Sequence, residues 1–244
     1  MLGSIQPQPI PHETDGTLSL ERLAAAIKPI DPHFARTRLL ALENTWHGRA
    51  LPLPYLRAAQ DFARERGLAL HLDGARLYNA ATVSGVTARE IARHFDSVSV
   101  CLSKGLGAPV GSVLVGSAAL IDKARRWRKV AGGGWRQAGL LAAACLYALD
   151  HHVARLADDH ARAAKLAERL RQVAGVTVLG QHTNMVFVDV PANRLRELDA
   201  HLRSGKIRIS IGYLPTLRLV THLDIDDEGI ERAATAFATL FGQT

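Results

Sequence analysis

Cysteine is scarce in this 244-residue sequence, which contains only Cys101 and Cys145. Two cysteines are too few for the framework of disulfide bridges that stabilises small secreted domains, and they suit a reducing compartment. The commonest role of such cysteines is that of small buried apolar side chains. We therefore expect a cytoplasmic protein without structural disulfides.

Long apolar runs and a leader are also missing from the sequence. No stretch of about 18 uncharged apolar residues occurs, so we expect no membrane span. The first residues, MLGSIQPQPIPHE, lack the basic and apolar regions of a secretory signal. With 48% apolar and 22% charged residues, the chain has an ordinary globular composition, and it is long enough for two unequal domains.

The chain carries a net charge of +7, yet it lacks a motif that reads a nucleic-acid groove. Most arginines alternate with acidic residues, as in DDHARAAKLAERLRQ. One denser cluster, KARRWRKVAGGGWRQ, covers residues 123–137. This cluster is either a solvated basic face or a site for phosphate or carboxylate groups, and we expect no nucleic-acid partner.

Apolar strands and amphipathic helices alternate through the first half of the chain. Strand patterns cover residues 36–44, 68–73, 97–103 and 110–117, and helical patterns cover 17–28, 51–67, 77–85 and 87–95. Alternation of this kind predicts βαβ units in a doubly wound, mainly parallel sheet. The fold class expected from the sequence is therefore α/β.

The second half of the chain has a different pattern. Residues 117–174 are mostly helical, and they are followed by strand patterns at 176–180, 184–190, 206–212 and 216–223, a helix at 194–205 and a closing helix from Asp226. This order predicts a smaller α+β module. We expect a large domain over residues 1–150 and a small C-terminal domain over residues 151–244.

Asp73 and Lys104 each follow a strand of the predicted parallel sheet. About 30 residues separate them, the length of one βαβ crossover. Ligands of open α/β sheets bind beyond the carboxyl ends of the strands, so both side chains are expected at the same crevice.

Pyridoxal phosphate is a ligand that needs both residue types. Its aldehyde forms a Schiff base with a lysine amine, and a carboxylate beside its ring nitrogen keeps that nitrogen protonated. Ser103 would bind the phosphate or support the loop, and Gly105 and Gly107 would allow a tight turn. The alternatives stay open: Asp73 as an ordinary Asp-Gly turn residue and Lys104 as a solvated loop lysine.

Two long segments around these residues resemble a known family. LHLDGARLYNA and SVCLSKGLGAPVGSVLVG are similar to the low-specificity threonine aldolases of the fold-type-I superfamily that depends on pyridoxal phosphate. RWRKVAGGGWRQAG, TNMVFV and LRLVTHLD agree as well, so the resemblance extends from residue 2 to the C-terminus. It implies cleavage of L-threonine and L-allo-threonine to glycine and an aldehyde by a homotetramer that is a dimer of dimers.

The resemblance assigns cofactor roles to four residues. Lys104 would hold the cofactor covalently, and Asp73 would pair with the ring nitrogen. Arg76 would lie near the cofactor or the substrate carboxylate, and Ser103 beside the cofactor.

The resemblance also implies substrate contacts. Arg218 would bind the α-carboxylate through its planar guanidinium group, with Arg76, Lys129 and Arg136 near the anionic end of the site. His33 resembles a family histidine near the substrate hydroxyl, so His33 or a water would be the base. Arg218 as a solvent-facing strand residue and His33 as a surface-loop residue remain the alternatives. We expect no metal site.

The sequence departs from the family pattern in two places. Family members have a substantial segment before LGSIQPQPI, with a glycine/threonine phosphate loop and a histidine that stacks on the ring. We therefore expect an incomplete large domain that exposes apolar surface and a sheet edge, and a weakly soluble chain. The second departure is Trp46-His47, where the family has His-Asn after ENT; it either alters the substrate site or packs in the core. The alternative functions are another lyase of this cofactor, a β-eliminating one, and an inactive remnant.

Overall fold

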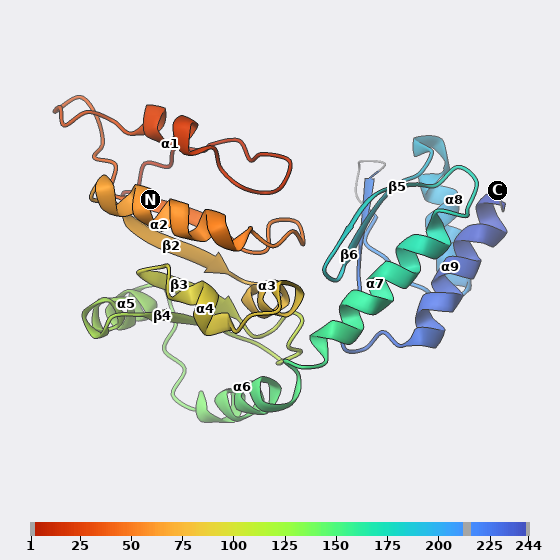
Figure 1. The fold of residues 1–244 in the computed structure, drawn as a ribbon. Coiled ribbons are helices and arrows are strands. Elements are labelled where there is room, and N and C mark those ends of the chain that lie inside the picture. Colours follow the sequence, from red (N-terminus) through yellow and green to blue (C-terminus); the bar gives the residue numbers. More distant parts are fainter. Residues whose placement is uncertain (1–2, 212–215, 243–244) are drawn as a thin grey trace. The chain divides into compact units, whose positions relative to one another are not determined.

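The computed structural model of the chain describes residues 3–211 and 216–242. It forms two compact units, shown in Figure 1. The N-terminal unit comprises Met1–Cys101 and Ser112–Leu140, and the C-terminal unit comprises Leu102–Gly111 and Leu141–Thr244. Each unit is described by itself.

The N-terminal unit is built on a four-stranded sheet in the order β1-β2-β3-β4. Its strands are β1 (Leu39–Glu43), β2 (Ala69–Gly74), β3 (Ser97–Cys101) and β4 (Ser112–Gly116). β1, β2 and β3 run parallel, whereas β4 pairs with β3 in the antiparallel sense. The carboxyl ends of β1, β2 and β3 therefore lie along one edge of the sheet.

Five helices accompany this sheet: α1 (Leu20–Ala26), α2 (Leu53–Glu65), α3 (Leu77–Ser84), α4 (Ala88–Ala92) and α5 (Ala118–Val130). α2 packs on β2, α3 packs on α4, and α5 contacts β4. Local sequence explains several helix ends. The Ser19 side chain caps α1, and Thr87 and Glu90 form a reciprocal capping box at α4. Gly85, with φ 64°, ends α3 in the left-handed conformation.

The two faces of this sheet differ in burial. Alternate apolar residues point to a covered face, where they are at most 9% exposed: Leu40, Leu42, Leu70, Leu72, Val98 and Val100. The other face carries smaller or polar residues such as Ala41, His71 and Ser99, which are half-buried or exposed, and every residue of β4 is exposed. Helices on both faces of a doubly wound sheet were expected, but in the described residues one face is open. Apolar side chains such as Leu39 and Val115 are more than half exposed, as the sequence predicted.

The C-terminal unit contains an antiparallel sheet of β5 (Thr177–His182), β6 (Met185–Asp189) and β7 (Thr216–Val220) in that order. The elements around it are α6 (Gly139–His151), α7 (Leu156–Leu170), the 3₁₀ turn η1 (Ala192–Arg194), α8 (Leu195–Ser204) and α9 (Asp227–Phe241). α7 and α9 lie side by side, and α7 packs on β5 and β6 (Figure 1). The core between sheet and helices includes Leu170, Val186, Leu198, Leu217, Ile230 and Phe237.

The mixed α/β class and the mainly parallel first sheet are confirmed. One predicted strand is wrong: residues 206–211 form no strand. Ile207, Ile209 and Ile211 alternate as a strand would and pack against the C-terminal core, but their backbone does not join the sheet. The alternation of apolar and polar residues in this segment reflects side-chain burial, and it does not indicate pairing with another strand.

The boundaries of the two compact units differ from the domain boundary that the sequence predicted. Residues 102–111 and 141–150 belong to the C-terminal unit, although the sequence placed them in the domain that ends at residue 150. The expected boundary between a cofactor-binding domain of residues 1–150 and a small domain of residues 151–244 stays a prediction about function.

Candidate active site

Asp73 lies at the carboxyl edge of the first sheet. It occupies the penultimate position of β2, paired in register with Glu43 of β1 and Ser99 of β3. The Asn44 N–H donates to the Asp73 carbonyl at 2.9 Å, which fixes the backbone. The side chain is exposed, and one carboxylate oxygen accepts from the Ala75 N–H at 3.0 Å. Asp73 thus forms the expected Asp-Gly turn and still presents its carboxylate.

The residues after Asp73 turn the chain directly into a helix. A Cβ atom on Gly74 would lie 2.9 Å from the Ser99 carbonyl oxygen, so no other residue fits between β2 and β3. Arg76 is the N-cap residue of α3 and is half-buried. The tight turn keeps Arg76 close in the chain to Asp73, at the same edge of the sheet.

Lys104 lies in a loop, residues 102–111, that closes on itself. The Leu102 N–H donates to the Gly111 carbonyl at 2.9 Å, and the Ala108 N–H donates to the Leu102 carbonyl at 3.0 Å. Inside this closure the Gly107 N–H donates to the Lys104 carbonyl at 2.9 Å, forming a turn. The Lys104 backbone is therefore held by main-chain hydrogen bonds.

Apolar side chains anchor the same loop. Leu102, Leu106 and Ala108 are at most 6% exposed, whereas Ser103 and Lys104 are exposed. Gly107 has φ +70°, and a Cβ there would lie 2.9 Å from Leu223 Cδ2. The loop thus presents the exposed Lys104 side chain from a fixed backbone turn, and the choice between a cofactor lysine and a solvated loop lysine stays a prediction.

Connectivity relates the Lys104 loop to the Asp73 strand. The loop begins at Leu102, directly after β3 ends at Cys101. β3 is the parallel neighbour of β2, with Ser99 opposite Asp73. Lys104 therefore follows, after a short connection, the carboxyl end of the strand that pairs with the Asp73 strand.

Arg218 lies on β7, opposite Phe187 of β6. Its neighbours Leu217 and Leu219 are buried in the C-terminal core, so Arg218 points to the opposite, exposed face of the sheet. The exposed position agrees with either a carboxylate-binding arginine or a solvated one.

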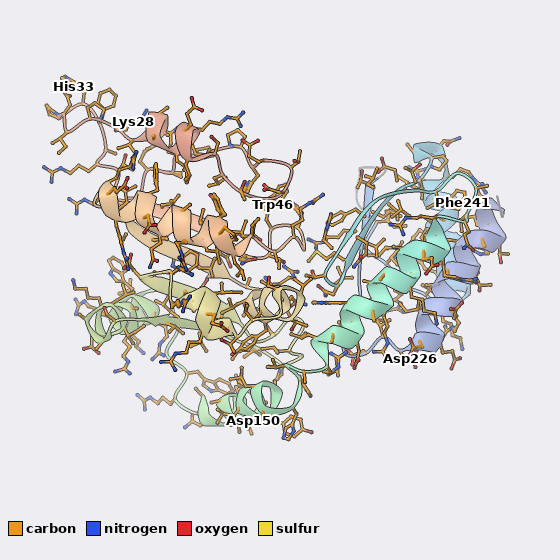
Figure 2. All side chains as sticks on the ribbon, in the orientation of Figure 1. Lys28, His33, Trp46, Asp150, Asp226 and Phe241 are labelled. Atoms are coloured by element: carbon orange, nitrogen blue, oxygen red, sulfur yellow. The ribbon has the colours of Figure 1, made fainter. Side chains whose placement is uncertain are left out.

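His33 lies in the segment that leads into β1, on an exposed loop (Figure 2). Its Nδ1 atom is 2.7 Å from Asp31 Oδ1, and its side chain is 85% exposed. Hydrogen bonds from the His33 backbone N–H and then from its ring lower the pKa of Asp31. In the part of the chain that the structure describes, His33 hydrogen-bonds with Asp31 and with none of the predicted site residues, and its catalytic role stays a prediction.

Lys129 and Arg136 lie on and after the last turn of α5, and both are exposed. A Cβ on Gly134 would be 2.7 Å from Lys129 Nζ, so the ammonium group lies over the glycine turn. Between residues 3–211 and 216–242, neither side chain forms an ion pair with an acidic residue. The role predicted for Lys129 and Arg136 at the anionic end of the site stays a prediction.

Trp46, the departure from the family pattern, packs against its own unit. Its ring stacks on His12 with centroids 4.6 Å apart and planes 17° from parallel, and the Arg49 guanidinium lies 5.7 Å from its centroid. Burial lowers the pKa of His12, while the Glu43 carboxylate opposes this shift. These contacts of Trp46 are packing contacts within its own unit, and an effect on the substrate site stays a prediction.

Metal and membrane features were also searched in residues 3–211 and 216–242. No group of three or more histidine, cysteine, aspartate or glutamate side chains there could hold a metal ion. No helix in this part of the chain has the length and apolar character needed to cross a bilayer.

Sequence reasoning missed one residue near the loop. His152, which follows α6, contacts the Leu106 carbonyl of the Lys104 loop. No spacing or motif signals this contact, because 46 residues separate the two partners.

Comparison with known proteins places these features in a family context. The family model described as beta-eliminating lyase matches residues 1–193. The low specificity L-threonine aldolase of Escherichia coli strain K12 is 52% identical over 234 residues, which are 96% of this chain and 69% of that protein. The low-specificity L-threonine aldolase 1 of Arabidopsis thaliana is 41% identical over 248 residues, which are 97% of this chain and 69% of that protein.

Solved structures agree on the fold. The threonine aldolase of Leishmania major superposes with a TM-score of 0.76 at 23% identity, and the match covers 93% of this chain and 68% of that one. At this level of identity the likeness concerns the fold alone.

Proposed function

This chain belongs to the β-eliminating lyase family, and we propose that it is a pyridoxal-phosphate-dependent aldehyde-lyase that cleaves L-threonine and L-allo-threonine to glycine and an aldehyde. The observation that carries the proposal is the Lys104 turn, which leaves the sheet from the strand next to Asp73. The amine of Lys104 and the carboxylate of Asp73, both exposed, are the two functional groups that a pyridine aldehyde needs at its aldehyde and at its ring nitrogen.

The residues present fit pyridoxal phosphate. Lys104 offers a primary amine, and Asp73 offers a carboxylate whose second oxygen accepts no hydrogen bond from the described residues. A protonated ring nitrogen supplies the missing donor. When bound, the cofactor takes up the electron pair released as the Cα–Cβ bond breaks.

Asp73 and Lys104 have different tasks in this proposal. The Asp73 carboxylate holds a proton on the ring nitrogen, since an adjacent negative charge favours the charged form of that nitrogen. Lys104 would hold the aldehyde end of the cofactor through its primary amine. Arg76, in the turn after Asp73, and Ser103, directly before Lys104, would support the cofactor.

Substrate recognition is assigned to the cationic residues. Arg218 binds the α-carboxylate, and Arg76, Lys129 and Arg136 supply further positive charge. His33 or a water accepts the hydroxyl proton as the bond to Cβ breaks, after which the aldehyde leaves and glycine follows.

A β-eliminating lyase is the second candidate, and the description of the matching family model favours it. Both reactions begin with the same amino acid bound to the same cofactor. From threonine, glycine with acetaldehyde identifies the aldolase, whereas 2-oxobutanoate with ammonia identifies the elimination of water. An inactive remnant would give neither.

We also propose a homotetramer in the cytoplasm. Apolar side chains of α5, α6 and the segment between them are more than half exposed, namely Trp127, Val130, Trp135, Leu140, Leu146 and Tyr147. Surfaces of this kind mark contacts with other subunits. Cys101 and Cys145 are both thiols, which suits a reducing compartment.

The test is chemical trapping of the cofactor. The protein is incubated with pyridoxal phosphate and reduced with borohydride, and the labelled peptide is located by mass spectrometry. We expect label on Lys104, its loss in Lys104→Ala together with threonine cleavage, and full retention in the control Lys123→Ala. Label on Lys104→Ala equal to that of the parent protein would refute the assignment.

A further inference from the structure

His152 is held next to the Lys104 loop by its own backbone. It follows α6 directly, and its N–H donates to the Ala148 carbonyl at 2.9 Å. Tyr147 lies edge-on to its ring, with centroids 5.6 Å apart, and the side chain is half-buried. The imidazole therefore approaches the loop from a fixed point in the same unit.

The ring reaches a main-chain carbonyl of the loop. His152 Nδ1 lies 2.6 Å from the Leu106 carbonyl oxygen. A carbonyl only accepts, so Nδ1 must carry the proton and donate it. Leu106 is 3% exposed, so its carbonyl depends on a protein donor in place of bulk water.

The carbonyl that His152 holds belongs to the same peptide group as the Gly107 N–H. That N–H donates to the Lys104 carbonyl at 2.9 Å. The two hydrogen bonds are therefore linked through one peptide group. His152 donates to its carbonyl, that of Leu106, and its N–H, that of Gly107, donates to the Lys104 carbonyl. Each bond in such a chain strengthens the other.

Packing also restricts the same turn. A Cβ on Gly107 would lie 2.9 Å from Leu223 Cδ2, and its distance from His152 Nδ1 would be 3.7 Å. Leu223 follows β7, the strand that carries Arg218. The peptide between Leu106 and Gly107 is thus fixed from two elements of the C-terminal unit.

We propose that His152 is a positioning residue for Lys104. By donating to the Leu106 carbonyl it fixes the peptide plane whose N–H holds the Lys104 backbone, and so it sets the direction from which the amine meets the cofactor aldehyde. This inference rests on the proposed function, because it assumes that Lys104 holds the cofactor.

Three variants separate the hydrogen bond from packing. His152→Asn places a donor, Nδ2, where the ring has Nδ1; His152→Gln places its donor one bond further out; His152→Leu removes the donor and keeps an apolar side chain. The neighbouring, exposed His151, which contacts Tyr147, supplies the matched control His151→Leu.

The first measurement needs no cofactor. Hydrogen–deuterium exchange of the peptide that contains residues 102–111 reports the Gly107 amide. We expect exchange about tenfold faster in His152→Leu and His152→Gln, and parental exchange in His152→Asn and His151→Leu. Unchanged exchange in His152→Leu, or equal acceleration in His151→Leu, would overturn the proposal.

The second measurement follows the amine itself. In His152→Leu we expect borohydride trapping of pyridoxal phosphate on Lys104 to slow about tenfold. We also expect kcat to fall while KM for threonine changes little, and His152→Asn to restore the trapping rate and kcat. Loss confined to KM would overturn the positioning role. A parental protein that takes no cofactor on Lys104 would instead refute the proposed function, whatever the exchange result.

Discussion

Gly107 and Gly67 have nearly the same backbone angle but different surroundings. Both are in the left-handed region, with φ of +70° and +63°. A Cβ on Gly67 would meet nothing within 4 Å, whereas one on Gly107 would meet Leu223 at 2.9 Å. The sequence predicted a glycine turn after Lys104, but it could not show that a leucine more than a hundred residues later also requires the glycine.

Alanine substitutions at Gly67 and Gly107 therefore separate the cost of a left-handed φ from the cost of a steric clash. We expect Gly67→Ala to cost about 1 kcal/mol of unfolding free energy, from the left-handed φ alone. Gly107→Ala should cost roughly 1 kcal/mol more, because the loop must also move away from Leu223. Urea unfolding of both variants measures the difference, and equal losses would show that the Leu223 contact does not restrict the loop.

Asp159 is the most completely buried carboxylate that the structure pairs. Its side chain is 0% exposed, and both of its oxygens accept from the terminal nitrogens of Arg155, one turn earlier. Removing one partner of a buried pair leaves the other charge without compensation. Asp159→Ala should therefore destabilise the protein by about 3 kcal/mol.

The exposed pair Arg203–Asp199 on α8 provides the control for this prediction. Asp199→Ala should change the unfolding free energy by less than about 0.5 kcal/mol, since solvent screens exposed pairs. Denaturant titrations of the two variants give the comparison. Similar losses at the two positions would mean that burial does not determine the strength of the Arg155–Asp159 pair.

At the scale of elements, helices were easier to predict than strands. Capping residues such as Ser19 and Thr87 stand in the local sequence, and the structure uses both as N-caps. Pairing of strands depends on partners that are distant in the sequence. For this reason residues 206–211 have the sequence pattern of a strand but form none. The antiparallel direction of β4 is likewise a property of the turn before it, the Lys104 loop, and not of the strand itself.

The capping box of α4 makes stability depend on pH. Hydrogen bonds first from the Thr87 backbone N–H and then from its hydroxyl lower the pKa of Glu90 below its ordinary value of 4.5. The stabilisation is therefore complete above 4.5 and is lost as the pH falls through the lower folded-state pKa.

Glu90→Gln tests this dependence because it keeps a neutral acceptor in place of the carboxylate. The urea midpoint of the variant should lie below that of the parent at neutral pH, and the gap should close under acid conditions. In a Thr87→Ala background, which removes the hydroxyl donor and keeps the backbone N–H, the gap at neutral pH should be smaller and should still close in acid. A gap that widens in acid would contradict the linkage.

At the scale of the whole molecule, the fold class and the site strands followed from the sequence. The alternation of apolar strands with helices predicted the parallel arrangement of β1, β2 and β3, and Asp73 was predicted at a strand end, where it lies. The position of His152 against the Lys104 loop was not predictable, because it arises from tertiary packing between residues far apart in the chain. The same holds for the Trp46–His12 stack, which no local pattern encodes.

The relation between Lys104 and Asp73 is the central claim, and the cofactor ring nitrogen reports on it directly. Pyridoxal phosphate labelled with ¹⁵N at that nitrogen is bound to the parent protein and to Asp73→Asn, with attachment to Lys104 checked by reduction and mass spectrometry. The ¹⁵N chemical shift should show a protonated nitrogen in the parent at neutral pH and an unprotonated one in Asp73→Asn. The same protonation state in both, with the cofactor on Lys104, would contradict the claim that the Asp73 carboxylate and the Lys104 amine serve one ring.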